Sequence, residues 1–91
     1  MLIISYDIKD DKLRTNFSKF LCKFGYRLQY SVYNIKNSKR ILENISKEIT
    51  NTYEKKFDQN DSVYIFNLSE NCKITKFGYA KNVDHDTIIV V

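Results

Sequence analysis

Two stripes of apolar side chains at helical spacing constrain the fold of this chain more than any other feature. They recur every three or four residues, which is the spacing of one helix face. The stripes are Leu13, Phe17, Phe20, Leu21 and Phe24, then Ile41, Leu42, Ile45, Ile49, Tyr53 and Phe57. Each helix therefore has one face to bury, and it needs another element to bury that face against.

Capping signals border both stripes. Asp10 or Asp11 is a natural N-cap for the first helix, and Gly25 supplies a stop after about residue 24. Asn37 or Ser38 can cap the second helix in the same way. These positions predict two helices of different length with a short segment between them.

Apolar and aromatic runs at strand length fill the rest of the chain. The first alternates clearly, with Leu2, Ile4, Tyr6 and Ile8 on one face. The expected strands are 2–8, 27–35, 62–68, 72–80 and 87–91, with a hairpin loop at 69–71. The order β-α-β-α-β-β-β predicts an α+β sandwich, one sheet with two helices on one face.

An uncovered apolar sheet face is the consequence of this layout. Two helices of this size cover only one face, yet the strands carry apolar or aromatic residues on both sides. The terminal run 87–91, TIIVV, also needs a strand edge to pair with. We therefore expect a homodimer, with a main domain at 1–80 and a segment at 81–91 exchanged or docked at the dimer interface.

Charge and cysteine content narrow the function classes. The 91 residues carry a formal charge of +4, which favours an anionic partner such as nucleic acid. The two cysteines, Cys22 and Cys72, are too few and too far apart for a disulfide framework or a zinc site, so a reduced cytosolic compartment is expected. The N-terminal run has no basic segment and is too short for a signal or membrane span.

Asp7 raises a question of its own, because it ends a strand that is otherwise buried. It is either a solvated strand-end residue, or it meets a cation there. Two copies of Asp7 that meet across a two-fold axis would repel each other unless a divalent metal such as Mg²⁺ joined them. Asp10 and Asp11 are read as helix caps, and His85 as a solvated loop residue.

Four stretches taken together resemble the CRISPR-associated protein 2 family: ISYDI (4–8), DDKLR (10–14), FLCKFGYR (20–27) and LQYSVY (28–33). The resemblance extends over the whole chain. It implies a ferredoxin-like sandwich with a mostly antiparallel sheet, and that plan expects a further strand before the second helix, which the pattern of 27–36 does not separate.

The resemblance also implies a function. Family members act as homodimers in the prokaryotic cytoplasm in CRISPR spacer acquisition, where they hold prespacer DNA and bridge the integrase subunit, CRISPR-associated protein 1. Several are described as metal-dependent endonucleases on RNA or DNA, with Mg²⁺ or Mn²⁺ as the metal. No membrane partner is expected.

The family's functional positions fall on five residues here. Asp7 is the metal-binding and catalytic position, and the other catalytic positions are Tyr6, Arg14, Arg27 and Tyr33. A position that is often basic in the family is Asn16, so one cation for substrate phosphate is missing.

As bare sequence features, Arg14 and Arg27 are equally readable as partners of surface ion pairs, and the two tyrosines as packing residues. Lys12, Lys19 and Lys23 lie on one flank of the first helix, where with Arg14 they can contact nucleic acid or form a solvated face.

Two other functions stay open. One is an architectural DNA-binding scaffold without nuclease activity. The other is an RNA-recognition module, because KFGYA (76–80) faintly resembles an aromatic RNA-binding signature, although the order of glycine and aromatic residue differs.

Overall fold

The computed structural model describes residues 1–68 and 73–78. Its strands are β1 (Leu2–Asp7), β2 (Gly25–Gln29), β3 (Val32–Ile35), β4 (Ser62–Asn67) and β5 (Lys73–Gly78). Its helices are α1 (Asp11–Leu21) and α2 (Lys39–Glu48), and α2 continues through a π-helical turn (Ile49–Tyr53) and a 3₁₀ turn (Glu54–Lys56). The predicted hairpin loop 69–71, Cys72, residues 79–80, His85 and the whole segment 81–91 lie outside the described residues.

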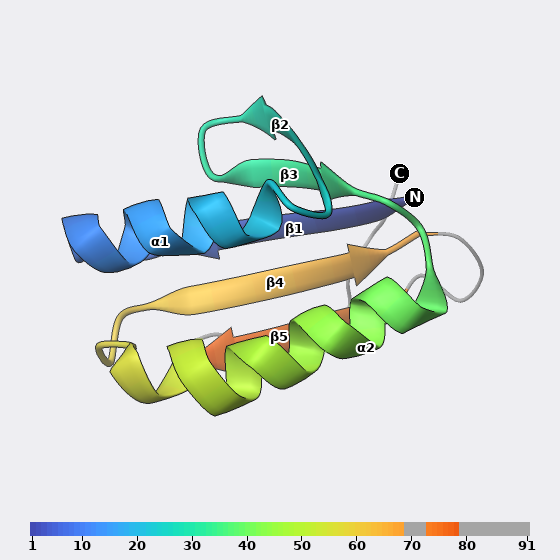
Figure 1. The fold of residues 1–91 in the computed structure, drawn as a ribbon. Helices are drawn as coiled ribbons and strands as arrows, with labels where there is room; N and C mark the ends of the chain where they lie inside the picture. Colours follow the sequence, from blue (N-terminus) through green and yellow to red (C-terminus); the bar gives the residue numbers. More distant parts are fainter. Residues whose placement is uncertain (69–72, 79–91) are drawn as a thin grey trace.

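The strands form a five-stranded sheet in the order β2-β3-β1-β4-β5, and every neighbouring pair is antiparallel. Figure 1 shows both helices on the same face of this sheet. The βαββαβ order with β1 between β3 and β4 is the ferredoxin-like plan. The predicted α+β sandwich is confirmed.

The core lies between the helices and one face of the sheet. The alternation predicted for the first strand is confirmed, because Leu2, Ile4 and Tyr6 are buried while Asp7 is exposed. The buried side chains that meet them come from both helices and from β3 and β4: Leu13, Phe17, Phe20, Leu21, Tyr33, Ile35, Ile45, Ile49, Val63 and Ile65. The rest of the two predicted stripes is partly buried against this core, and this packing holds the two layers together. The partly buried residues are Phe24, Ile41, Leu42, Tyr53 and Phe57.

Helix starts follow the predicted caps. Asp10 accepts a hydrogen bond from the Leu13 amide at 2.8 Å, and Ser38 accepts one from the Ile41 amide at 3.4 Å. Each oxygen satisfies an amide that has no partner within its own helix. The sequence offered two candidates at each start, and the structure selects Asp10 and Ser38.

The single strand read over 27–35 is wrong, and the further strand that the family plan expects before the second helix is present. Residues 25–35 form a hairpin instead, with Ser31 at φ 63° in the turn and a register shift between Arg27 and Gln29. A positive φ costs a serine free energy, and no glycine or proline marks this turn in the sequence. The alternating pattern therefore reads as one continuous strand, although the chain reverses within it.

The predicted end of the first helix also needs correction. Helix α1 ends at Leu21, and Gly25 is the first residue of β2, not a helix stop. A Cβ on Gly25 would lie 2.0 Å from the Asn34 carbonyl oxygen, so glycine is required there by the close approach of β3. The Lys36 amide donates to the Phe24 carbonyl at 2.9 Å, which extends the hairpin beyond β2.

Candidate functional site at the end of the first strand

Asp7 is the last residue of β1, and its side chain faces solvent with 63% of its surface exposed. It lies on the sheet face that the helices leave open, with Ile3 and Ser5. The Lys9 ammonium lies 3.2 Å and 3.4 Å from the two carboxylate oxygens. The carboxylate therefore avoids the cost of burial, and its cationic partner comes from two residues along the same chain.

A hollow of about 240 Å³ surrounds this carboxylate. The Tyr6 amide donates to the Ser31 carbonyl at 3.1 Å, which brings the β2–β3 turn against the end of β1. The hollow is lined by Tyr6, Asp7, Ile8, Lys9, Arg14, Tyr30 and Ser31. In Figure 1 the end of β1, the start of α1 and this turn lie at the same end of the sheet.

Sequence reasoning did not assign four residues of this hollow to the site: Ile8, Lys9, Tyr30 and Ser31. Lys9 had a readable signal, because residues two apart in an extended chain face the same side and opposite charges there can pair. Tyr30 and Ser31 had none, because they belong to the turn of a hairpin that the alternating pattern concealed.

Arg14 lies in the hollow but is engaged by the protein itself. One terminal nitrogen donates to the Ile8 carbonyl at 3.1 Å and to the Lys9 carbonyl at 3.3 Å. The other contacts the Asp11 carboxylate, and this hydrogen bond raises the pKa of Arg14. Arg14 therefore holds the turn between β1 and α1 in place. The interpretation of Arg14 as an ion-pair partner is confirmed by its contact with Asp11.

Arg27 and Tyr33 form a second group on the helix side of the sheet. The buried Tyr33 hydroxyl contacts the Ser18 hydroxyl and accepts a hydrogen bond from Arg27 Nε at 3.3 Å. A terminal nitrogen of Arg27 donates to Ser18 Oγ at 3.3 Å, and Cys22 Sγ lies 3.7 Å from the same Tyr33 oxygen. The bond to Tyr33 raises the pKa of Arg27.

Tyr6 joins the two groups. Tyr6 is among the residues that line the hollow, and its buried ring stacks on Tyr33 with centroids 6.2 Å apart and packs edge-on against Phe17 at 5.2 Å. Burial raises the pKa of the Tyr6 hydroxyl, and a hydrogen bond with Ser18 opposes that shift. The structure thus brings Tyr6, Tyr33 and Arg27 together, while no hydrogen bond in the described part of the chain joins Asp7 to any of them.

The donor set for a metal ion is small within one chain. Asp7 is the only carboxylate among the residues that line the hollow, and residues 1–68 and 73–78 contain no group of three or more His, Cys, Asp or Glu that could hold a metal ion. Mg²⁺ prefers an octahedron of oxygens. Within one chain Asp7 would therefore supply one ligand, and water, phosphate oxygens or a second carboxylate would have to supply the others.

The lysines predicted to contact nucleic acid are exposed. Lys12 and Lys19 lie on α1 and Lys23 follows its end, with Asn16 exposed on the same helix. Their exposure agrees with both readings given above, a nucleic-acid contact and a solvated helix face.

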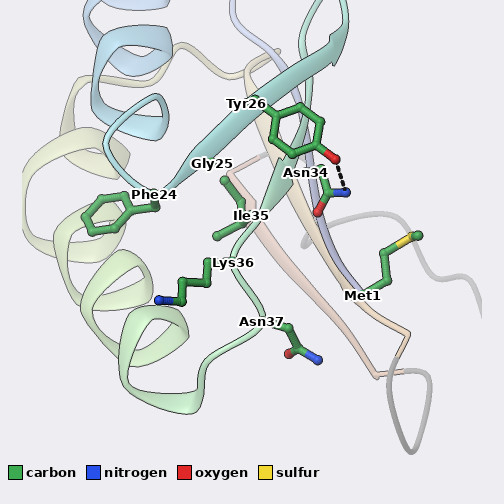
Figure 2. Close-up of a pocket in the computed structure, with 8 residues that line it drawn as sticks. All are labelled: Met1, Phe24, Gly25, Tyr26, Asn34, Ile35, Lys36 and Asn37. Carbon is green, nitrogen blue, oxygen red and sulfur yellow. Dashed lines mark hydrogen bonds between the residues drawn. The ribbon is translucent and has the colours of Figure 1, made fainter.

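A second hollow, of about 370 Å³, lies at the other end of β1. Figure 2 shows Tyr26 and Asn34 side by side at its rim, joined by a hydrogen bond of 3.1 Å from the Asn34 amide to the Tyr26 hydroxyl. Met1, Phe24, Gly25, Ile35, Lys36 and Asn37 complete the lining. Because β1 runs the length of the sheet between them, this hollow is separate from the one at Asp7.

Residues 1–75 match the family model for CRISPR associated protein Cas2. The chain belongs to the Cas2 family. Its similarity to the CRISPR-associated endoribonuclease Cas2 2 of Methanospirillum hungatei is 32% identity over 80 residues, which covers 85% of this chain and 84% of that protein. A CRISPR-associated endoribonuclease Cas2 3 of Synechocystis is 32% identical over 69 residues, 76% of this chain and 72% of the relative.

A solved Cas2 structure has the same fold. The crystal structure of Streptococcus pyogenes Cas2 at pH 6.5 superposes with a TM-score of 0.62 at 19% identity, over 92% of this chain and 95% of that one. The ferredoxin-like plan expected from the resemblance is therefore confirmed. Among the described residues, no helix is long and apolar enough to cross a membrane.

Proposed function

We propose that this Cas2 protein is a metal-dependent endoribonuclease that works as a homodimer in CRISPR spacer acquisition. The observation that carries the proposal is the exposed Asp7 carboxylate, set in a hollow beside Lys9 and Arg14 at the end of β1. Relatives over most of the chain are named endoribonucleases. A carboxylate with cations around it suits a phosphodiester, whose charge the cations attract.

The open face of the sheet supports a dimer. Partly exposed apolar side chains from four strands lie there, and Tyr64 and Phe66 stack with ring centroids 5.8 Å apart. The others on this face are Ile3, Val32 and Ile74, which the strand pairing places next to them. Covering this face with a second copy would remove an apolar patch from water and bring two copies of Asp7 to one face.

Asp7 from each copy would hold Mg²⁺, or Mn²⁺ in its place. When bound, the ion would stabilise negative charge developing on the phosphodiester. The protein's own residues contribute orientation: the Asp7 carboxylate can accept a hydrogen bond from the attacking water, Arg14 fixes the turn, and Tyr6 packs behind the strand end. Arg27 and Tyr33 support Tyr6 from the helix side.

The test is cleavage of labelled RNA with Mg²⁺ by the wild type and by Asp7→Asn. We expect the variant to lose at least about 100-fold in rate, because it removes the one carboxylate of the hollow. Glu43→Gln, an exposed acid on α2, is the matched control and should cleave as the wild type does. Undiminished cleavage by Asp7→Asn would refute the proposal.

The dimer is tested by sedimentation at several protein concentrations. Phe66→Lys places a charge on the open sheet face and should shift the protein to a monomer, while Glu43→Lys on the helix side should not. A wild type that sediments as one chain at working concentrations contradicts the shared site.

A scaffold role without cleavage is the second candidate, and the exposed lysines of α1 favour it. In this role the dimer would hold prespacer DNA and contact the integrase subunit, CRISPR-associated protein 1. Reversing the charges of Lys12, Lys19 and Lys23 should then weaken DNA binding for all sequences alike and flatten its salt dependence. Asp7→Asn should still support spacer acquisition in cells if this role is the main one.

A further inference from the structure

Lys9 has a main chain that the fold fixes on both sides. Its amide donates to Asp61 Oδ1 at 2.9 Å, and Asp61 is buried with 1% of its surface exposed. The second Asp61 oxygen accepts from the Asp58 amide at 2.7 Å. The Lys9 carbonyl accepts from Arg14 at 3.3 Å. The backbone position from which the Lys9 side chain extends is therefore fixed by a loop more than fifty residues later in the chain.

The side chain itself extends into the Asp7 hollow and stays accessible. Its ammonium contacts the Asp7 carboxylate, and 59% of its surface is exposed. An exposed ion pair of this kind is weak, because water screens both charges. The ammonium can therefore leave Asp7 for a stronger anion at little cost.

The two cations of the hollow differ in what they can do. The Arg14 guanidinium is bound to two carbonyls and to Asp11. The Lys9 ammonium has Asp7 as its charged partner and no structural carbonyl to hold. A phosphate that enters this hollow thus meets Lys9 as the cation that is free to turn toward it.

We propose that the Lys9 ammonium binds a backbone phosphate of the RNA at the Asp7 hollow, and that it leaves the Asp7 carboxylate in doing so. In the unliganded protein Lys9 neutralises Asp7 and keeps the site from repelling RNA. Arrival of the phosphate moves the ammonium to the RNA and exposes the carboxylate. The inference rests on the proposed function for its substrate.

The experiment measures binding without cleavage. A labelled single-stranded RNA is titrated with the full chain in EDTA by fluorescence anisotropy, at several salt concentrations. Loss of one phosphate contact on a single strand lowers the slope of log K against log salt by about 0.7. We expect this change for Lys9→Met and not for Lys9→Arg, nor for the control Lys47→Met, which removes an equal charge from the exposed face of α2.

Asp7→Asn gives the decisive contrast, because it should release Lys9. The variant should bind RNA about two- to five-fold more tightly than the wild type without metal. In the Asp7→Asn background Lys9→Met should still lower the salt slope by about 0.7, because the phosphate contact of Lys9 does not need the carboxylate. The main-chain bonds of Lys9 survive substitution of its side chain, and thermal unfolding of each variant checks that they do.

Two results overturn the inference: a Lys9→Met salt slope equal to that of Lys47→Met, or a Lys9→Met change that leaves the salt slope unaltered in the Asp7→Asn background. Wild-type protein that binds no RNA would overturn it together with the proposed function. Lys9-dependent binding without Mg²⁺-dependent cleavage would refute the nuclease proposal alone and leave the phosphate contact standing.

Discussion

Asp61 is a buried carboxylate whose removal should be costly, and the structure allows the cost to be worked out. It accepts two backbone hydrogen bonds, from Lys9 at 2.9 Å and from Asp58 at 2.7 Å. Asp61→Ala removes the acceptor of both part-buried amides, and an amide left unsatisfied costs up to about 1–3 kcal/mol. The change also removes the cost of burying a carboxylate, which offsets part of that. We expect a net loss of about 2–4 kcal/mol of unfolding free energy.

Urea denaturation followed by circular dichroism measures this loss, and thermal unfolding gives an independent value. For a chain of this size a loss of about 3 kcal/mol corresponds to a fall in Tm of roughly 12–24 °C. Asp61→Asn keeps one acceptor oxygen, so it should lose about half as much. Comparisons need equal protein concentration, because dimer formation would contribute to stability.

Glu43→Ala is the control, since it removes one exposed acidic charge from α2. It should change stability by less than about 0.5 kcal/mol. If Asp61→Ala unfolds at the same urea concentration as Glu43→Ala, the two amides are satisfied in another way and Asp61 does not fix the main chain of Lys9.

Three further predictions concern the rest of the site's support. Gly25→Ala should lower stability by about 2 kcal/mol or more in urea titration, because its Cβ would lie 2.0 Å from the Asn34 carbonyl oxygen; a stable variant would show that β2 can move away. Burial raises the pKa of Tyr6 above its ordinary value of 10.0, so the unfolded chain ionises first and stability should fall as pH rises past about 10. Tyr6→Phe should make that fall smaller in melts across alkaline pH, and an identical fall would contradict the assignment. Ser18→Ala should cost about 0.5–1.5 kcal/mol in thermal unfolding through its lost contacts with Tyr33 and Arg27, and no change would show these contacts to be dispensable.

Local patterns accounted for most of the fold. The alternation of β1 and the two helical stripes predicted which side chains are buried, and the two helix starts followed from capping residues. The hairpin was missed because its turn uses Ser31 at positive φ, a conformation without a compositional signal. The helix end was misplaced because Gly25 is needed for a close strand contact, and a stop signal and a packing requirement read alike in a sequence.

The site was predicted only in part, because some of its residues come together only through tertiary contacts. The position of Asp7 at the end of a buried strand raised the question of a site, and the family resemblance assigned site roles to Tyr6, Tyr33 and Arg27, which do lie together. Arg14 is in the hollow but is held by Asp11 and by two carbonyls. Its surroundings depend on how the β1–α1 turn closes, which spacing alone does not specify.

The sequence by itself determined the fold class and the buried faces, because periodicity and capping depend on residues a few positions apart. Its short motifs carried the resemblance to the family. The tertiary structure decided what surrounds Asp7. It placed the β2–β3 turn against β1, and it anchored the Lys9 amide on a carboxylate 52 residues later. Contacts between residues so far apart form only when the sheet closes, since chain connectivity alone does not bring them together.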